Sequence, residues 1–191
     1  MINQFNFLAD CISSAILSEK DENTRVIKII KCIKIANELE DLKNFNDMFA
    51  VVSGLQNTVV SRLEKTWKKV PKNIIDILST LDNLTDVLNG CKQLKIITLN
   101  SNPPLIPYLG SFLIEISNNE DLPNTINNNL IHWKKKVKIW ETISQLKKFQ
   151  NCLYDFFAND NLQILFNSQK VYTESEMWEK SCEIEKPPNM N

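Results

Sequence analysis

Apolar residues recur at helical spacing along most of the chain. Between residues 24 and 39 they stand three and four positions apart, at Val26, Ile29, Ile30, Ile33 and Ala36. Lysines fill the positions between them. This spacing collects the apolar side chains on one face and predicts an amphipathic helix over residues 24–39.

Further helices are predicted where caps precede the same spacing. Asn44 or Asn46 can cap the next helix, because an asparagine oxygen accepts an otherwise unpaired backbone N–H. Pro71 suits another helix start, since its missing N–H would be unpaired there anyway. Thr173 and Glu176 have the spacing of a capping box near the C-terminus.

The middle of the chain reads as two helices joined by a polar loop. The prolines in residues 103–107 predict an extended segment. A short helix is predicted over residues 107–117, an asparagine-rich loop over 118–129 and a long helix over 130–150. Tryptophan side chains bury large apolar areas. Three of them are therefore predicted to lie in the core, namely Trp67, Trp133 and Trp140.

Composition favours one soluble, all-α domain. A chain of 191 residues with only three glycines disfavours glycine-turned β-sandwiches and phosphate-binding loops. The 22 basic and 23 acidic residues nearly cancel, which argues against a nucleic-acid partner. No apolar run reaches the about 20 residues of a membrane-spanning helix, and no signal peptide is recognised. We therefore expect a cytoplasmic protein.

The sequence offers no set of residues for metal binding or covalent catalysis. The five cysteines are scattered and form no C-x-x-C pair, so no zinc site and no disulfide framework is predicted. His132 is the only histidine and is interpreted as a polar residue on a helix face. Candidate nucleophiles therefore lack a placed base, and no cofactor or metal is expected.

Four short motifs carry more specific information through their order and spacing. They are LKNFND at 42–47, VSGL at 52–55 followed by RLEKTW at 62–67, NPPLIPYLG at 102–110 and SCEIEKP at 181–187. Together they resemble the catalytic domain of Ras-type guanine-nucleotide exchange factors, the Son-of-sevenless class. The resemblance assigns residues 1–187 to one such domain without the family's first helices, and leaves residues 188–191 as a frayed tail.

The resemblance implies an all-α bowl that grips a small GTPase of the Ras, Rap or Ral type. It also implies a protruding helical hairpin, formed by residues 107–119, the following loop and the helix from Leu130. Such a hairpin opens the nucleotide site, and binding to the nucleotide-free GTPase lowers the affinity for GDP by linkage. The expected function is therefore guanine-nucleotide exchange without covalent chemistry.

The family pattern also places candidate residues at the hairpin tip. Ser117 falls at a small or apolar position, and Glu120 with Asp121 falls on an acidic pair. A carboxylate there would compete with phosphate for the lysine and metal site of the GTPase. The family continues with a glycine and Asn-Pro, whereas this chain has Leu-Pro-Asn at 122–124.

Contacts to the GTPase carry over by position to a second set of residues. They are Phe49, Gln56, Thr58, Ser61, Arg62, Cys91 and Gly110. An internal role is predicted equally for Arg62, with Glu64 or a backbone carbonyl as its partner. Cys91 stands where the family often has an aromatic residue, and Gly110 is expected to allow close helix approach at the hairpin base.

Two alternatives stay open at this point. A GTPase-binding or scaffold protein with the same fold but no exchange activity is the second interpretation, suggested by the altered tip and by Cys91. The lysines around Trp133 are interpreted as a solvated face, with contact to an anionic membrane as the alternative. Peripheral membrane recruitment is therefore not decided by the sequence.

Overall fold

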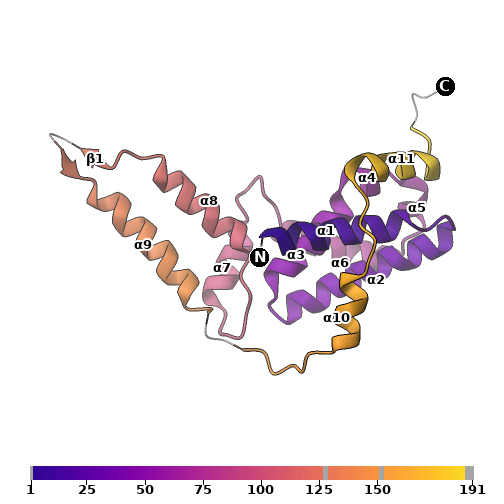
Figure 1. The fold of residues 1–191 in the computed structure, drawn as a ribbon, viewed down its shortest axis with the longest axis horizontal. Helices are drawn as coiled ribbons and strands as arrows, with labels where there is room; N and C mark the ends of the chain where they lie inside the picture. The colour runs from indigo at the N-terminus through magenta and orange to yellow at the C-terminus, as the bar shows by residue number, and fades with distance from the viewer. Residues whose placement is uncertain (1, 127–128, 151–152, 188–191) are drawn as a thin grey trace.

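The computed structural model describes residues 2–126, 129–150 and 153–187, and the regular secondary structure of these residues is helical except for one pair of short strands. Figure 1 shows two arms that diverge from a common base. One arm is a projecting hairpin, and the other ends in the helices α4 and α11. The prediction of an all-α fold with a protruding helical hairpin is confirmed.

Three long helices build the centre of the molecule. They are α1 (Ile2–Leu17), α2 (Glu22–Asp41) and α3 (Phe45–Gln56). The helix predicted over residues 24–39 is confirmed as α2. Asn44 is the N-cap of α3, and its side-chain oxygen accepts a hydrogen bond from the backbone N–H of Asp47 at 3.2 Å. The side chains of α3 are buried on nearly all sides, because α3 packs between α1 and α2.

Shorter helices continue from this centre. The chain forms α4 (Thr58–Ser61), α5 (Glu64–Lys68), α6 (Lys72–Leu84) and α7 (Lys92–Asn100). Pro71 directly precedes α6 as its N-cap, which confirms the predicted helix start. After the hairpin, the chain forms α10 (Asp160–Asn167) and α11 (Glu174–Ile184). The predicted capping box at Thr173 and Glu176 is confirmed at the start of α11.

The hairpin consists of α8 (Leu109–Glu120), strand β1 (Thr125–Ile126), strand β2 (Leu130–Ile131) and α9 (Trp133–Lys147). The prediction of a loop over residues 118–129 is wrong for residues 118–120 and 125–126, and the helix predicted from residue 130 begins only at Trp133. Helix α8 runs on to Glu120, with the Asn119 side chain donating a hydrogen bond to the carbonyl of Glu115 at 2.7 Å. Beyond it, Thr125 pairs with Ile131 in an antiparallel ladder, which satisfies backbone groups at the turn.

The main hydrophobic core lies under α1, α2 and α3. Its fully buried members include Ile16, Ile29, Met48 and Val52. Among the residues that the structure describes, none between positions 109 and 170 belongs to this core cluster. The hairpin is therefore an appendage with its own internal packing.

The three tryptophans predicted to lie in the core behave differently. Trp67 is half-buried against the core, and its indole N–H donates to the carbonyl of Val60 at 3.0 Å. Trp133 and Trp140 are 71% and 67% exposed, so the prediction is wrong for both. Since the hairpin projects from the core, only the side of α9 that faces α8 is covered, and this side carries Lys135 and Thr142.

No helix within the described ranges is both long enough and apolar enough to cross a membrane.

Candidate functional site

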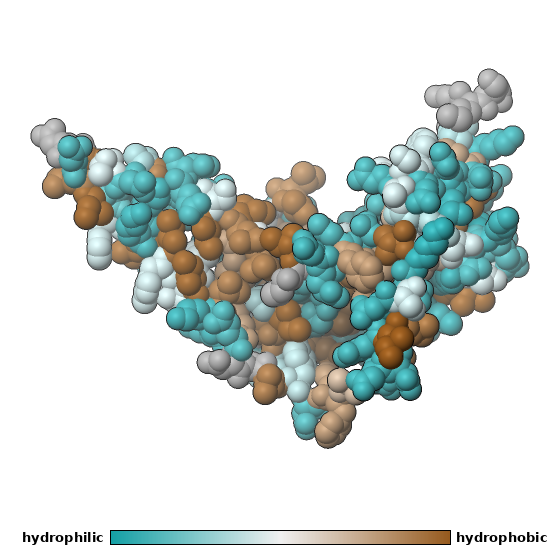
Figure 2. Space-filling view, viewed as in Figure 1, coloured by the Kyte–Doolittle hydropathy of each residue, from teal (hydrophilic) through white to brown (hydrophobic). Residues whose placement is uncertain are grey.

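A hollow lies between the hairpin and the arm formed by α4 and α11. Figure 2 shows the molecular surface hollowed between the two arms. Helix α8 lies on the side of the hollow, and α9 lies on the far side of the hairpin (Figure 1). The two walls of this hollow come from segments about 50 residues or more apart in the chain.

The residues predicted for the hairpin tip lie on the exposed side of α8. Ser117, Glu120 and Asp121 are all exposed. Ser117 and Asp121 stand three and seven residues after Ile114, so the three share one helix face. Phe112 faces the opposite way and is buried. The structure thus brings the three predicted tip residues to the end of one wall.

Sequence reasoning missed two apolar residues on the same side of α8. Leu113 and Ile114 are 41% and 52% exposed. Their exposure could have been predicted from the sequence. They directly follow Phe112, and one helix turn cannot bury three consecutive side chains against a single neighbour.

A buried lysine holds the end of α8. The Lys135 ammonium donates hydrogen bonds to the carbonyls of Glu120 at 2.9 Å and Leu122 at 2.6 Å. These carbonyls belong to the C-terminal end of α8, where unpaired acceptors and the helix dipole favour a cation. The interpretation of the lysines around Trp133 as a solvated face is therefore wrong for Lys135, which is only 4% exposed.

The segment after α8 is also bound to the start of α9. The His132 backbone N–H donates to the carbonyl of Asn124 at 2.9 Å, and the imidazole Nδ1 lies 2.9 Å from the carbonyl of Pro123. His132 is the N-cap residue of α9. The Leu-Pro-Asn sequence at 122–124 is therefore held by α9 rather than left as an open loop.

Two contacts join the hairpin to the centre of the molecule. Lys95 of α7 forms an ion pair with Glu115 of α8 at 2.5 Å. The Tyr108 ring, directly before α8, lies 4.2 Å from the Phe49 ring and 5.9 Å from the Phe5 ring, measured between centroids. A Cβ at Gly110 would clash with the Tyr108 ring, so the group that approaches Gly110 closely is this ring and not the helix that was predicted.

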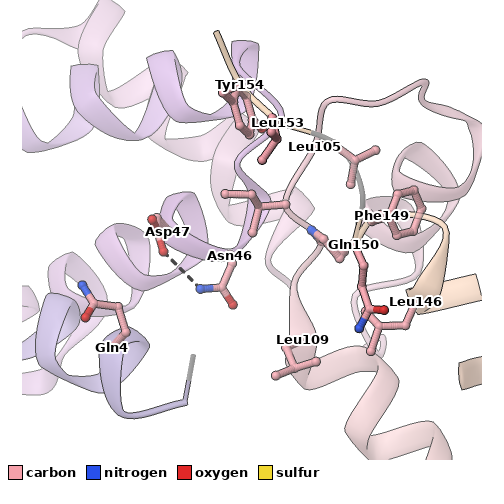
Figure 3. Close-up of a pocket in the computed structure, with 12 residues that line it drawn as sticks. Gln4, Asn46, Asp47, Leu105, Leu109, Leu146, Phe149, Gln150, Leu153 and Tyr154 are labelled. Carbon is pink, nitrogen blue, oxygen red and sulfur yellow. Dashed lines mark hydrogen bonds between the residues drawn. The ribbon is translucent and has the colours of Figure 1, made fainter. Parts of the chain in front are cut away.

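A pocket of about 500 Å³ lies at the joint between hairpin and centre, shown in Figure 3. Leu109 and Leu146, at the two base ends of the hairpin, both line it. Tyr154 closes the other side, with its hydroxyl donating to the carbonyl of Leu42 at 2.7 Å. Burial raises the pKa of Tyr154. The pocket marks the place where the two ends of the hairpin come together.

The opposite wall carries the polar residues that were predicted to contact the GTPase. Gln56, Thr58 and Ser61 are exposed at the end of α3 and along α4. The Gln56 amide donates to the Asp82 carboxylate at 2.8 Å. Burial raises the pKa of Asp82, and the bond from Gln56 partly offsets this rise.

Two other predicted contact residues are part of the interior. Phe49 is 4% exposed inside the ring cluster with Phe5 and Tyr108. Cys91 is buried at the start of α7, and desolvation raises the pKa of its thiol. The prediction of direct contact is therefore corrected for both residues, because neither presents a side chain at the surface.

Arg62 ties α4 to α11. Its guanidinium donates to the carbonyl and hydroxyl oxygens of Ser181 at 2.9 and 2.7 Å, and to the carbonyl of Glu185 at 2.7 Å. It also lies 5.5 Å from the centre of the Trp178 ring. The predicted internal role of Arg62 is confirmed, with backbone carbonyls rather than Glu64 as its partners.

Glu185 closes the same junction from the other side. Its carboxylate accepts hydrogen bonds from the backbone N–H groups of Lys65 and Thr66, each at 3.1 Å. The RLEKTW and SCEIEKP motifs therefore bind one another across more than 110 residues of sequence. Among the residues that the structure describes, no three His, Cys, Asp or Glu side chains are grouped to hold a metal ion.

Comparison with known proteins agrees with this arrangement. The sequence model of the RasGEF domain matches residues 1–137 of this chain. The chain belongs to the RasGEF domain family. Within that match lie α1 to α8 and the start of α9, so the RasGEF similarity includes the helix that lines the hairpin side of the hollow.

Individual relatives extend the RasGEF similarity to nearly the whole chain. Ras guanine nucleotide exchange factor K of Dictyostelium discoideum is 30% identical over 92% of this chain and 11% of its own length. Human Ras-specific guanine nucleotide-releasing factor 1 is 30% identical over 95% of this chain and 14% of its own length. Ras guanine nucleotide exchange factor R of D. discoideum is 32% identical over 100% of this chain and 11% of its own length. The chain thus spans a small part of the length of these relatives.

Proposed function

We propose that this RasGEF domain promotes GDP release from a small GTPase of the Ras family. The relatives are named as exchange or releasing factors for Ras, and the sequence similarity to them covers nearly all of this chain. We also propose that residues 1–187 act as one domain in the cytoplasm. The contacts of Arg62 with Ser181 and Glu185 support this unit, because they bind the C-terminal helix to the first half of the chain.

The observation that carries the proposal is the projecting hairpin beside an open hollow. Ser117, Glu120 and Asp121 are exposed at the end of α8, on the hairpin wall. A GTPase seated in the hollow would meet these residues on one side. On the other side it would meet the polar surface of Gln56, Thr58 and Ser61.

Exchange of this kind requires no covalent chemistry. The domain binds the nucleotide-free GTPase more tightly than the nucleotide-bound form, and by linkage it then weakens nucleotide binding by the same factor. The carboxylates of Glu120 and Asp121 would compete with the phosphates for the cationic groups of the GTPase. GTP then enters because cells hold it in excess over GDP.

The apolar residues Leu113 and Ile114 add a second kind of contact. Both are exposed on α8, where they would displace a switch segment by burying apolar surface against it. Phe49 and Cys91 would support the surface from beneath without touching the partner. The Ras, Rap and Ral types are the candidate GTPases.

Fluorescent GDP release from purified Ras, Rap and Ral tests the proposal. The chain should accelerate release from at least one of them. The double variant Glu120→Ala and Asp121→Ala should slow GDP release about tenfold or more. Its affinity for the nucleotide-free GTPase should fall by a smaller factor. A matched variant that removes the exposed acids of α2 and α6, Glu38→Ala with Asp76→Ala, should release GDP at the unmodified rate.

One observation favours a second function, namely GTPase binding without exchange. Residues 122–124 are held by Lys135 and His132, where the family has a glycine and Asn-Pro. Stoichiometric binding to an empty GTPase with no acceleration of GDP release would establish that function instead. Equal losses of binding and release in the Glu120 and Asp121 variant would contradict a specific role at the tip.

A further inference from the structure

We propose that the outer side of the hairpin is a docking surface for an anionic lipid bilayer. This surface, here called the lipid face, consists of Trp133, Lys136, Trp140 and Lys147 on α9, beside the exposed Leu130 and Ile131 at the free end of the hairpin. The proposal goes beyond nucleotide exchange and does not depend on it. It rests on the exposure, shape and charge of this surface.

The two tryptophans are the strongest feature of the lipid face. Trp133 and Trp140 stand seven residues apart on α9, so they lie two turns apart on the same side of the helix. Both indole rings are about 70% exposed. Tryptophan combines an apolar ring with a polar N–H, and it is enriched where hydrocarbon meets water at membrane surfaces.

The free end of the hairpin adds aliphatic side chains. Leu130 and Ile131 of β2 are 63% and 66% exposed. Figure 2 shows hydrophobic residues gathered at this end of the arm. These apolar side chains protrude into solvent at the free end of the hairpin. A fluid bilayer accepts protruding apolar side chains, whereas a folded protein partner would need a matching cavity.

The charge of α9 complements anionic lipids. The helix contains five lysines and one glutamate, while the whole chain carries a net charge of −1. Lys135 is used internally, but Lys134, Lys136, Lys138 and Lys147 are exposed. Lys136 and Lys147 stand three and fourteen residues after Trp133, so they share its side of the helix. Each lysine near an anionic membrane strengthens binding about fivefold.

The position of the lipid face leaves the hollow free. Helix α9 lies on the far side of the hairpin from the hollow (Figure 1). A bilayer in contact with α9 would therefore not compete with a protein bound between the two arms. The same basic charge would repel a second copy of this surface, which disfavours self-association through it.

Another exposed apolar helix serves as an internal contrast. Helix α10 has no buried residue, and Phe157 just before it is 99% exposed. The helix contains no lysine or arginine, so nothing there attracts an anionic surface. Phe157 is therefore a matched control for an exposed aromatic ring without neighbouring positive charge.

Sedimentation with vesicles tests the proposal without any GTPase. The whole chain should bind vesicles of 30 mol% phosphatidylserine in phosphatidylcholine at 0.1 M salt, and release from them at 0.5 M salt. Trp133→Ala with Trp140→Ala should weaken binding about tenfold or more. Lys136→Gln with Lys147→Gln should weaken it roughly twentyfold.

The controls separate the lipid face from general charge and hydrophobicity. Phe157→Ala should bind as the unmodified chain does, and so should Lys31→Gln with Lys34→Gln on the exposed side of α2. Because all these side chains are exposed, the thermal midpoint of each variant should stay unchanged. If the double alanine variant of Trp133 and Trp140 has a lower thermal midpoint, the double variant Trp133→Gln and Trp140→Gln takes its place.

Three outcomes would overturn the proposal. The first is absence of binding to the phosphatidylserine vesicles. The second is equal binding to pure phosphatidylcholine, or equal losses in the control variants. The third is a concentration-dependent dimer that the tryptophan variant abolishes while the vesicles stay unbound, which would assign this surface to a second copy. Each of these leaves the proposed exchange activity untouched, since no GTPase is present.

Discussion

Arg62 joins the end of α4 to the C-terminal helix α11. Its guanidinium reaches three acceptor atoms on Ser181 and Glu185 in a planar arrangement that a lysine ammonium cannot reproduce. The side chain is half-buried, so the acceptors would be poorly hydrated without it. Arg62 therefore stabilises the α4–α11 arm together with the Glu185 carboxylate.

Replacing Arg62→Met should lower the free energy of unfolding by about 2–3 kcal/mol, because hydrogen bonds to charged groups are lost and their acceptors stay unpaired. Arg62→Lys should recover less than half of this loss. Urea denaturation measures both. Lys65→Met is the matched control, since the exposed Lys65 side chain makes none of these contacts. Equal stability of Arg62→Met and the control would show that the junction is held by other contacts.

A second residue-scale prediction concerns Cys32, which is buried in α2. Desolvation raises the pKa of its thiol from 9.0 to about 11 in the folded protein. In the unfolded chain the thiol ionises near its ordinary pKa, so the unfolded state loses its proton first as the pH rises. The free energy of unfolding should therefore fall between pH 9 and pH 11, and this group should contribute no pH dependence below pH 8.

Comparison with Cys32→Ala isolates this effect from the lysines and tyrosines that titrate in the same range. The unmodified chain should lose about 2–3 kcal/mol more than the variant between pH 8 and pH 11. Urea midpoints at several pH values provide the measurement. Parallel pH profiles for the two proteins would mean that the thiol is open to solvent in the folded state.

The sequence predicted residues well where a motif or a backbone rule specified their surroundings. Thr173 was found as a cap, and the cap of α3 was narrowed to Asn44 or Asn46, because capping depends on local side-chain chemistry. Burial depends on what lies opposite a side chain, and a single helix does not carry that information. For this reason Trp133 was predicted to be buried and Lys135 to be solvated, and both predictions are wrong.

At the scale of elements, the hairpin shows the same division. The two helices and their order followed from spacing and from the prolines of residues 103–107. The pairing of Thr125 with Ile131 did not, because strands of two residues leave no alternating pattern to read. The Lys135 ammonium also binds the carbonyls of Glu120 and Leu122. Contacts from α9 therefore hold the residues at and directly after the end of α8.

Removing this lysine should loosen the tip without unfolding the centre. Lys135→Met leaves the carbonyls of Glu120 and Leu122 unpaired, which should cost about 2 kcal/mol of local stability. Amide hydrogen exchange should then become faster at Thr125 and Ile131 by more than tenfold. Since the core cluster contains no described residue of the hairpin, the urea midpoint of the whole domain should change little.

Lys134→Met is the matched control for this change, because its side chain is exposed beside Lys135. Exchange rates at the strand amides should stay unchanged in the control. Unchanged protection in Lys135→Met as well would show that the strand pairing alone holds the tip. A shift of the whole-domain midpoint would instead show that the hairpin and the centre unfold together.

At the scale of the molecule, the core that stabilises the fold and the hairpin proposed to open the nucleotide site are different parts of the chain. The centre is stabilised by the core under α1 to α3, and the family motifs are used partly to close this unit through Arg62 and Glu185. The hairpin is joined at its base by the Lys95–Glu115 ion pair and by the Tyr108 ring. If the hairpin can be removed while the centre stays folded, its proposed role in GDP release can be tested directly.

Replacing residues 110–145 with a linker of about six glycines and serines should leave a folded centre. Leu109 and Leu146 line the same pocket, and six extended residues span about 20 Å, so the linker is long enough. Unfolding should remain cooperative, with a thermal midpoint lowered by only a few degrees. The loss of Phe112 and of the partner of Lys95 accounts for this decrease.

The shortened protein should still capture an empty GTPase weakly through the α4–α11 arm, while GDP release should fall to the rate of the GTPase alone. Capture on nucleotide-free GTPase and fluorescent GDP release measure the two effects separately. The full-length variant Lys147→Gln is the control, because it alters only an exposed lysine at the base end of α9 and should release GDP normally. If the shortened protein still accelerated GDP release, the hairpin would not be the element that opens the nucleotide site, because the α4–α11 side of the hollow would suffice.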